Sequence, residues 1–132
     1  MANDAAPVPG QIAWIDLSVP DAGAVRDFYQ DVTGWVPSSV SMGDYQDYCM
    51  NAADGRSVAG ICHARGDNAD LPAAWMVYIV VADPDAAMQR CEALGGKLLG
   101  APKSAGKGKL FCAIRDPAGA VAALYESRPQ AE

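Results

Sequence analysis

Three features are scarce or missing in this sequence, and each excludes a class of protein. The longest apolar run, residues 71–82, falls well short of the about 20 residues that a membrane-spanning helix needs. The 10 basic residues are scattered through a chain of net charge -6, so no nucleic-acid-binding surface is expected. The 4 cysteines form no C-x-x-C pair. We therefore expect buried, reduced thiols in a cytoplasmic protein.

The chain has a single histidine, His63, which restricts its chemistry. Any Ser-His or Cys-His nucleophile would have to use His63, and Cys62 beside it points to the opposite face of a strand. A hydrolase is therefore not favoured. The glycine-rich stretch 100–108 also fails as a phosphate-binding loop, because its spacing is wrong and no Ser or Thr follows Lys107. We expect a basic hairpin there.

An internal duplication organises the chain. Residues 121–126 match residues 58–63, and each run follows a turn signal and ends on a group that can bind a metal or titrate, Glu126 and His63. Upstream, residues 12–34 match residues 74–96 in pattern, although few positions are identical. In both copies an apolar strand reaches an Asp, the Asp opens a helix, and a Gly ends it.

Each copy therefore predicts a β-α-β-β-β unit. The first comprises a strand over 11–19, a helix from Asp21 to about 33, and strands near 35–40, 46–51 and 57–63. The second comprises a strand over 75–81, a helix opened by Asp83 and Pro84, and strands near 97–100, 110–115 and 120–126, with a loop over 101–109.

The alternation of side chains along the two leading strands assigns their faces. The helix-facing positions are Ile15, Leu17, Val19, Trp75, Val77, Ile79 and Val81. The opposite face carries Trp14, Asp16, Ser18, Met76, Tyr78 and Val80. The matching buried stripes of the helices are Val25, Phe28, Tyr29 and Val32 in the first copy, and Ala87, Cys91 and Leu94 in the second.

Chain length sets the expected domain organisation. Each half is too small to bury a comfortable core alone, so one shared domain is expected over 11–127 after a flexible tail over 1–10. Within it, module one covers 11–65, a polar linker covers 66–72, and module two covers 73–127.

These motifs resemble a known superfamily. The opening residues 12–21, the helix segment 26–29 followed by Gly34-Trp35, and the turn Asp116-Pro117-Ala118-Gly119 ahead of Leu124-Tyr125-Glu126 are similar to the vicinal oxygen chelate superfamily of glyoxalase I, bleomycin resistance proteins and extradiol dioxygenases. The resemblance implies an α+β fold in which two tandem β-α-β-β-β modules form curled mixed sheets around a cleft. It also implies a homodimer, and a divalent metal ion held by the first and last strands of both modules.

Carried onto this sequence, the four metal-binding positions of the family are Trp14, His63, Met76 and Glu126. His63 and Glu126 are good ligands for a first-row divalent ion, whereas an indole only donates a hydrogen bond and a thioether is a weak acceptor. No tightly bound cofactor is therefore expected. A divalent ion that did bind would use His63 and Glu126, with Asp16 or Tyr78 as further contributors.

The resemblance thus implies a small-molecule-binding protein of the glyoxalase/bleomycin resistance type. Its expected ligand-binding residues are Trp14, Asp16, Tyr45, Tyr48, His63, Met76, Tyr78 and Glu126. The alternative is a metal-dependent lyase or dioxygenase with His63 and Glu126 as the catalytic candidates. Each of these two residues also has an ordinary interpretation, as a hydrogen-bonded strand-end imidazole and a solvated carboxylate. A purely structural interaction module is least favoured.

Overall fold

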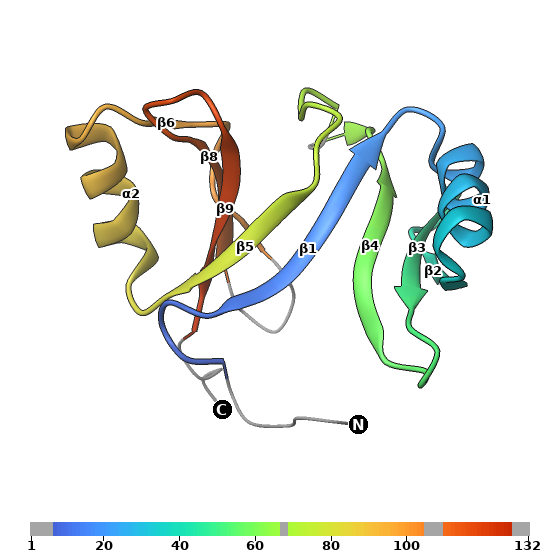
Figure 1. The fold of residues 1–132 in the computed structure, drawn as a ribbon. Helices are drawn as coiled ribbons and strands as arrows, with labels where there is room; N and C mark the ends of the chain where they lie inside the picture. Colours follow the sequence, from blue (N-terminus) through green and yellow to red (C-terminus); the bar gives the residue numbers. More distant parts are fainter. Residues whose placement is uncertain (1–6, 67–68, 105–109, 128–132) are drawn as a thin grey trace. The chain divides into compact units, whose positions relative to one another are not determined.

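The computed structural model describes residues 7–66, 69–104 and 110–127, and its described helices and strands follow the predicted order twice (Figure 1). The described residues divide into two compact units, of which the first is Ile15–Trp75 and the second combines residues 7–14 with the described residues from Met76 to 127. The fold is α+β with two β-α-β-β-β modules, as the sequence predicts.

In the first unit, four strands carry one helix. The strands are β1 (Ile12–Val19), β2 (Val36–Ser41), β3 (Gln46–Asn51) and β4 (Ser57–His63), and the helix is α1 (Ala22–Thr33). β2, β3 and β4 pair antiparallel in sequence, and β4 then pairs parallel with β1. The core forms where Leu17, Val19 and Ile61 meet Val25 of the helix, so the alternation in β1 predicted its buried face.

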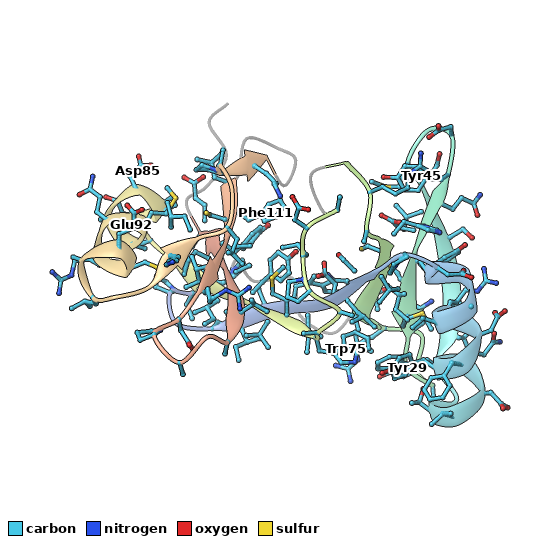
Figure 2. The ribbon with its side chains drawn as sticks, turned by 90° about the horizontal axis from the view of Figure 1, so that it is seen from above. Tyr29, Tyr45, Trp75, Asp85, Glu92 and Phe111 are labelled. Carbon is cyan, nitrogen blue, oxygen red and sulfur yellow. The ribbon has the colours of Figure 1, made fainter. Side chains whose placement is uncertain are left out.

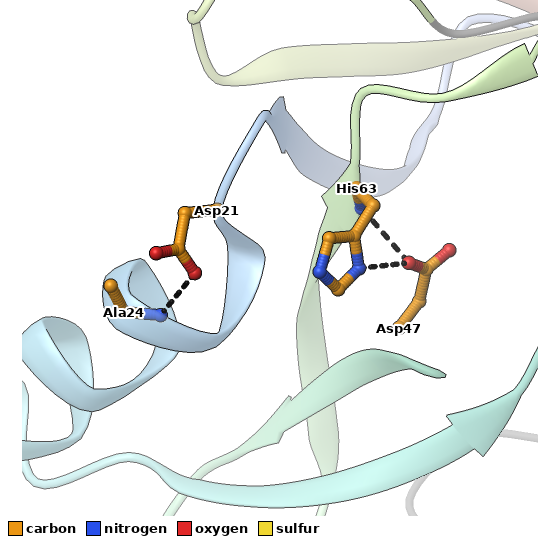
Figure 3. Close-up of polar contacts among 4 residues, drawn as sticks. All are labelled: Asp21, Ala24, Asp47 and His63. Carbon is orange, nitrogen blue, oxygen red and sulfur yellow. Dashed lines mark hydrogen bonds and ion pairs between the residues drawn. The ribbon is translucent and has the colours of Figure 1, made fainter. Parts of the chain in front are cut away.

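The two ends of α1 are set by the capping residues that the sequence predicts. The Asp21 carboxylate accepts a hydrogen bond from the Ala24 amide at 3.1 Å (Figure 3), and Gly34 ends the helix at φ 81°. The predicted buried stripe is only half right. Val25 and Tyr29 pack on the core, whereas Phe28 and Val32 are 57% and 63% exposed, because the short sheet beneath the helix offers surface to one narrow side only.

The second unit repeats the plan. Its strands are β5 (Met76–Val81), β6 (Lys97–Leu98), β7 (Lys103–Ser104), β8 (Leu110–Arg115) and β9 (Val121–Glu126), and its helix is α2 (Pro84–Ala93). β5 pairs parallel with β9, β9 pairs antiparallel with β8, and β8 pairs with both β6 and β7. The Asp83 carboxylate accepts from the Ala86 amide at 3.2 Å, so α2 is capped as predicted.

Two assignments in the second copy are wrong. Trp75 does not face α2: it precedes β5 and packs in the first unit, where its indole Nε1 donates to the Tyr29 hydroxyl at 3.1 Å and the two rings lie edge to face (Figure 2). Leu94 is 64% exposed, and Met88 fills the core against Leu124 instead. The loop predicted over 101–109 also contains the short strand β7.

Strand pairing confirms that His63 and Glu126 are equivalent. His63 lies opposite Val19 in the parallel pair of the first unit, and Glu126 lies opposite Val81 in that of the second. The residue that follows each of them makes the same backbone hydrogen bond. The Ala64 amide donates to the Val19 carbonyl oxygen at 2.8 Å, and the Ser127 amide donates to the Val81 carbonyl oxygen at 3.0 Å.

Parts of the predicted tail, linker and loop, namely residues 1–6, 67–68 and 105–109, lie outside the described residues. Among those that the structure describes, neither helix is long and apolar enough to cross a membrane.

Gly96 provides a test of the packing in the second unit. A Cβ there would lie 2.7 Å from the Cys91 sulfur and 3.0 Å from the Arg115 carbonyl oxygen. We expect Gly96→Ala to lower the free energy of unfolding by ~1–3 kcal/mol, measured by urea denaturation. Gly23→Ala in α1 is the matched control, because its Cβ would meet nothing closer than 3.7 Å and alanine favours helix by up to about 1 kcal/mol. Equal stability of the two variants would contradict the packing described.

Candidate functional site

The imidazole of His63 is held by a carboxylate from the neighbouring strand. Oδ1 of Asp47 in β3 accepts the backbone N–H of His63 at 2.9 Å and lies 3.3 Å from the ring nitrogen Nδ1 (Figure 3). The Asp47 side chain is 11% exposed and that of His63 is 21% exposed. Because the β3 carboxylate faces Nδ1, it favours the tautomer with the proton on Nδ1, which leaves the lone pair on Nε2.

Two tyrosine rings stand beside this imidazole. The Tyr45 ring lies edge-on to it with centroids 5.5 Å apart, and the Tyr48 ring lies tilted at 6.3 Å. Each tyrosine carries a guanidinium on its ring, that of Arg65 at 4.0 Å from the Tyr45 centroid and that of Arg26 at 4.6 Å from the Tyr48 centroid. The first unit therefore brings His63, Tyr45 and Tyr48 together, and their part in ligand binding stays a prediction.

The charges around this cluster are partly balanced. A hydrogen bond from Arg26 to Asp27 raises the pKa of the Arg26 guanidinium, with Tyr48 contributing. Arg65 lies 3.8 Å from Asp44 at the surface. The Arg26 guanidinium therefore remains a cation beside the Tyr48 ring.

The thiol of Cys62 is kept protonated. Burial raises its pKa most, and the negative charges of Asp16 and Asp47 raise the pKa further. Asp16 thus lies on the same side of the sheet as Cys62, on the face opposite α1, as its position in β1 predicts. A thiol that stays protonated is a poor nucleophile, which agrees with the exclusion of cysteine chemistry.

In the second unit, Glu126 is 6% exposed, and its Oε1 accepts the Leu110 amide at 3.0 Å. The expected role of Glu126 in ligand binding places its side chain in the cleft, on the face away from α2. The structure corrects this, because Leu124 packs on Met88 of α2. The error arose from taking the apolar side of β9 as a binding surface, whereas an apolar strand face packs first against its own helix.

The face of the second unit that lies opposite α2 is aromatic. Tyr78 and Phe111 have ring centroids 5.7 Å apart, and strand register puts Tyr125 and Val80 on the same face. Met76 shares this face by alternation and is 4% exposed. Trp14 is partly buried in β1 within this unit.

Two residues of these clusters escaped the sequence analysis. Asp47 gave a usable signal, since a carboxylate inside a predicted strand needs a partner when it is buried. Phe111 gave none, because an aromatic residue in a strand has an ordinary structural explanation.

Two of the four family metal-binding positions carry poor ligands, the indole of Trp14 and the thioether of Met76. Within residues 7–66, 69–104 and 110–127, no group of three or more His, Cys, Asp or Glu side chains could hold a metal ion. No chemical step is therefore assigned to a metal.

Comparison with known sequences gives a family and a relative. Residues 11–124 match the profile of the Glyoxalase/Bleomycin resistance protein/Dioxygenase superfamily. The anthracycline biosynthesis protein DnrV of Streptomyces peucetius is 33% identical over 130 residues, which cover 89% of this chain and 47% of that protein. The chain thus spans about half the length of this curated relative.

Comparison with solved structures supports the fold. A variant of Streptomyces coelicolor methylmalonyl-CoA epimerase in complex with 2-nitronate-propionyl-CoA aligns with a TM-score of 0.56 at 16% identity, covering 92% of this chain and 100% of that one. The methylmalonyl-CoA epimerase of Mycobacterium tuberculosis gives 0.57 at 15% identity, covering 98% and 94%.

The raised pKa of Cys62 makes stability depend on pH. Above about pH 8.5, a thiol in the unfolded chain loses its proton while Cys62 in the folded chain keeps it, so its contribution to stability falls as pH rises. We expect the stability gap between the wild type and Cys62→Ser to shrink by up to about 1.4 kcal/mol per pH unit from pH 9 to 10. Urea denaturation between pH 7 and 10 measures this gap, and a constant gap would refute the assignment.

Proposed function

Because the chain belongs to the Glyoxalase/Bleomycin resistance protein/Dioxygenase superfamily, we propose that it binds a small, planar aromatic molecule. The proposal is a binding function of the bleomycin-resistance type, and the aromatic face of the second unit is its principal contact surface. This face is defined by Tyr78, Phe111 and Tyr125.

The observation that carries the proposal is the tilted pair of Tyr78 and Phe111 on the face opposite α2. Both rings are partly buried, and the small residues Ala113 and Ala123 lie beside them by strand register. Ala113 and Ala123 are buried, so the partly exposed rings of Tyr78 and Phe111 supply the apolar surface on which we propose that a planar ligand stacks.

The similarity to DnrV supports the ligand class. That protein is described as an anthracycline biosynthesis protein, and anthracyclines are planar polycyclic aromatic compounds. At 33% identity over 89% of this chain, a shared preference for flat aromatic rings is a reasonable basis for choosing probes. The activity of the longer protein is not part of the function proposed for this chain.

The eight residues selected from the sequence keep distinct roles in the proposal. In the second unit, Trp14, Met76 and Tyr78 are proposed to supply apolar and aromatic contact. In the first unit, Tyr45 and Tyr48 supply rings around His63. Asp16 and His63 are the polar groups proposed to orient a ligand at the first unit. Glu126 lies on the side of the second sheet that packs on α2, so it is not part of the aromatic face. The metal-dependent lyase or dioxygenase alternative is not adopted, because no described observation favours it over binding.

Tryptophan fluorescence tests the ligand proposal directly. We expect anthraquinone-2-sulfonate, a planar aromatic probe, to quench the emission, and Trp14→Phe to reduce the quenching. Tyr78→Ala and Phe111→Ala should each weaken binding by up to about tenfold, since an aromatic contact contributes ~0.5–1.5 kcal/mol beyond its buried area.

Phe28→Ala is the matched control for these variants. It removes an aromatic ring that is 57% exposed on α1 of the first unit, so the probe affinity should not change. If Phe28→Ala weakens binding as much as Tyr78→Ala, or if neither Tyr78→Ala nor Phe111→Ala has an effect, the aromatic face is not the binding surface.

Metal content tests the alternative. Protein purified without chelator and then dialysed should hold less than one equivalent of divalent metal by elemental analysis. Losing even the outer hydrogen-bonding partners of a metal site lowers affinity ~10–100-fold, and here two of the four family ligand positions carry Trp14 and Met76. Stoichiometric metal after dialysis would instead favour a lyase or dioxygenase.

A further inference from the structure

We propose that Lys103 makes the aromatic face of the second unit selective for anions, so that this face binds planar aromatic molecules with an acidic group in preference to uncharged ones. The acidic group is a carboxylate, a sulfonate or a phenolate, which share a negative charge on oxygen. This inference rests on the proposed function. It adds the charge of the ligand and the residue that recognises this charge.

Strand register places Lys103 beside the aromatic rings. Lys103 of β7 lies directly opposite Phe111 of β8, and Phe111 in turn lies opposite Tyr125 of β9. Directly opposite residues in an antiparallel pair point to the same face of the sheet, with their Cβ atoms about 4.5–5.5 Å apart. Lys103 is partly buried. Its ammonium group is therefore within reach of a ligand that covers the two rings.

The charge of Lys103 also acts on the next residue of β8. Burial raises the pKa of the Cys112 thiol, and the positive charge of Lys103 partly opposes that rise. Cys112 follows Phe111 in β8 and packs in the core beneath α2. A positive charge that affects Cys112 lies close to β8, which agrees with the position that the register gives.

The charged side chains on this face are all basic. In the described strands β5 to β9, register and alternation put three charged residues on the face opposite α2, namely Lys97, Lys103 and Arg115. The acidic residue of these strands, Glu126, lies on the side that packs on α2. The whole chain has a net charge of -6, so a basic face is a local exception. Such a face favours an anionic ligand.

Two of these cations lie at the far end of the face. Lys97 is directly opposite Arg115, and like charges in this arrangement destabilise a sheet. Arg115 donates to the Gly119 carbonyl oxygen at 2.8 Å, so its guanidinium is held at the turn before β9. Four residue steps of β8 separate Arg115 from Phe111, roughly 13 Å at about 3.3 Å per step. Lys103 is therefore the cation that stands beside the rings.

Two matched probes test the selectivity. Anthraquinone-2-sulfonate and 2-(hydroxymethyl)anthraquinone share the same fused rings, but only the first carries a charge. We expect the wild type to bind the sulfonate about tenfold more tightly at low ionic strength, measured by tryptophan quenching, because a charge-assisted contact is stronger than a neutral one. Added sodium chloride should reduce this preference, since salt screens charges that solvent reaches.

Substitutions of Lys103 locate the source of the preference. Lys103→Met should abolish it and leave the affinity for the uncharged probe unchanged, which also shows that the variant is folded. Lys103→Arg should retain the preference because it retains the charge. Lys97→Met is the matched control, since it removes the same charge from the far end of the same face, and it should keep the preference.

The outcomes separate this inference from the proposed function. Equal loss of preference in Lys103→Met and Lys97→Met would indicate a general charge effect and overturn the role of Lys103. A wild type that binds both probes equally well would overturn the anion selectivity, whereas binding of aromatic molecules would stand. If neither probe binds, the proposed function is wrong and this inference is wrong with it.

Discussion

The parallel pairing of the first and last strands in each module is the constraint on which the rest of the structure depends. β1 with β4, and β5 with β9, can run parallel only if the intervening chain crosses back over the sheet. The helix supplies the first part of that crossover and buries one face of the sheet. The last residue of the closing strand is thereby fixed opposite the last residue of the leading strand, which is why His63 and Glu126 share a register.

Much of this fold could be predicted from the sequence, because its signals are local. Asp21 and Asp83 indicate where the helices start, because their carboxylates cap the first backbone amides. Gly34 indicates where α1 ends, because the residue there needs a positive φ. Alternation in β1 assigned Leu17 and Val19 to the core. Trp75, Phe28 and Leu94 were misplaced, since which side of an amphipathic segment is covered depends on how far the partner sheet extends.

The candidate site was less predictable, and the reason is visible in particular residues. Tyr45 and Tyr48 lie beside His63. The sequence named all three as ligand-binding candidates but did not predict their contact with one another. The partnership of Asp47 with His63 depends on the register of β3 against β4, which the sequence does not state. The side of the sheet that holds Glu126 was misjudged for a similar reason, as the choice is made by α2 and not by β9 itself.

The position of Trp75 shows that the two compact units do not coincide with the two sequence modules. Trp75 follows the linker, yet its indole donates a hydrogen bond to Tyr29 of the first unit. Gly10 and Gln11 precede β1, yet their backbones form hydrogen bonds with Val80 of the second unit. Each unit therefore includes a segment that the repeat boundary assigns to the other module. A cut at the linker would separate Trp75 and the first residues of β1 from the residues that they contact. The duplicated halves are therefore not autonomous fragments. An exchange of modules between related proteins would have to include these segments.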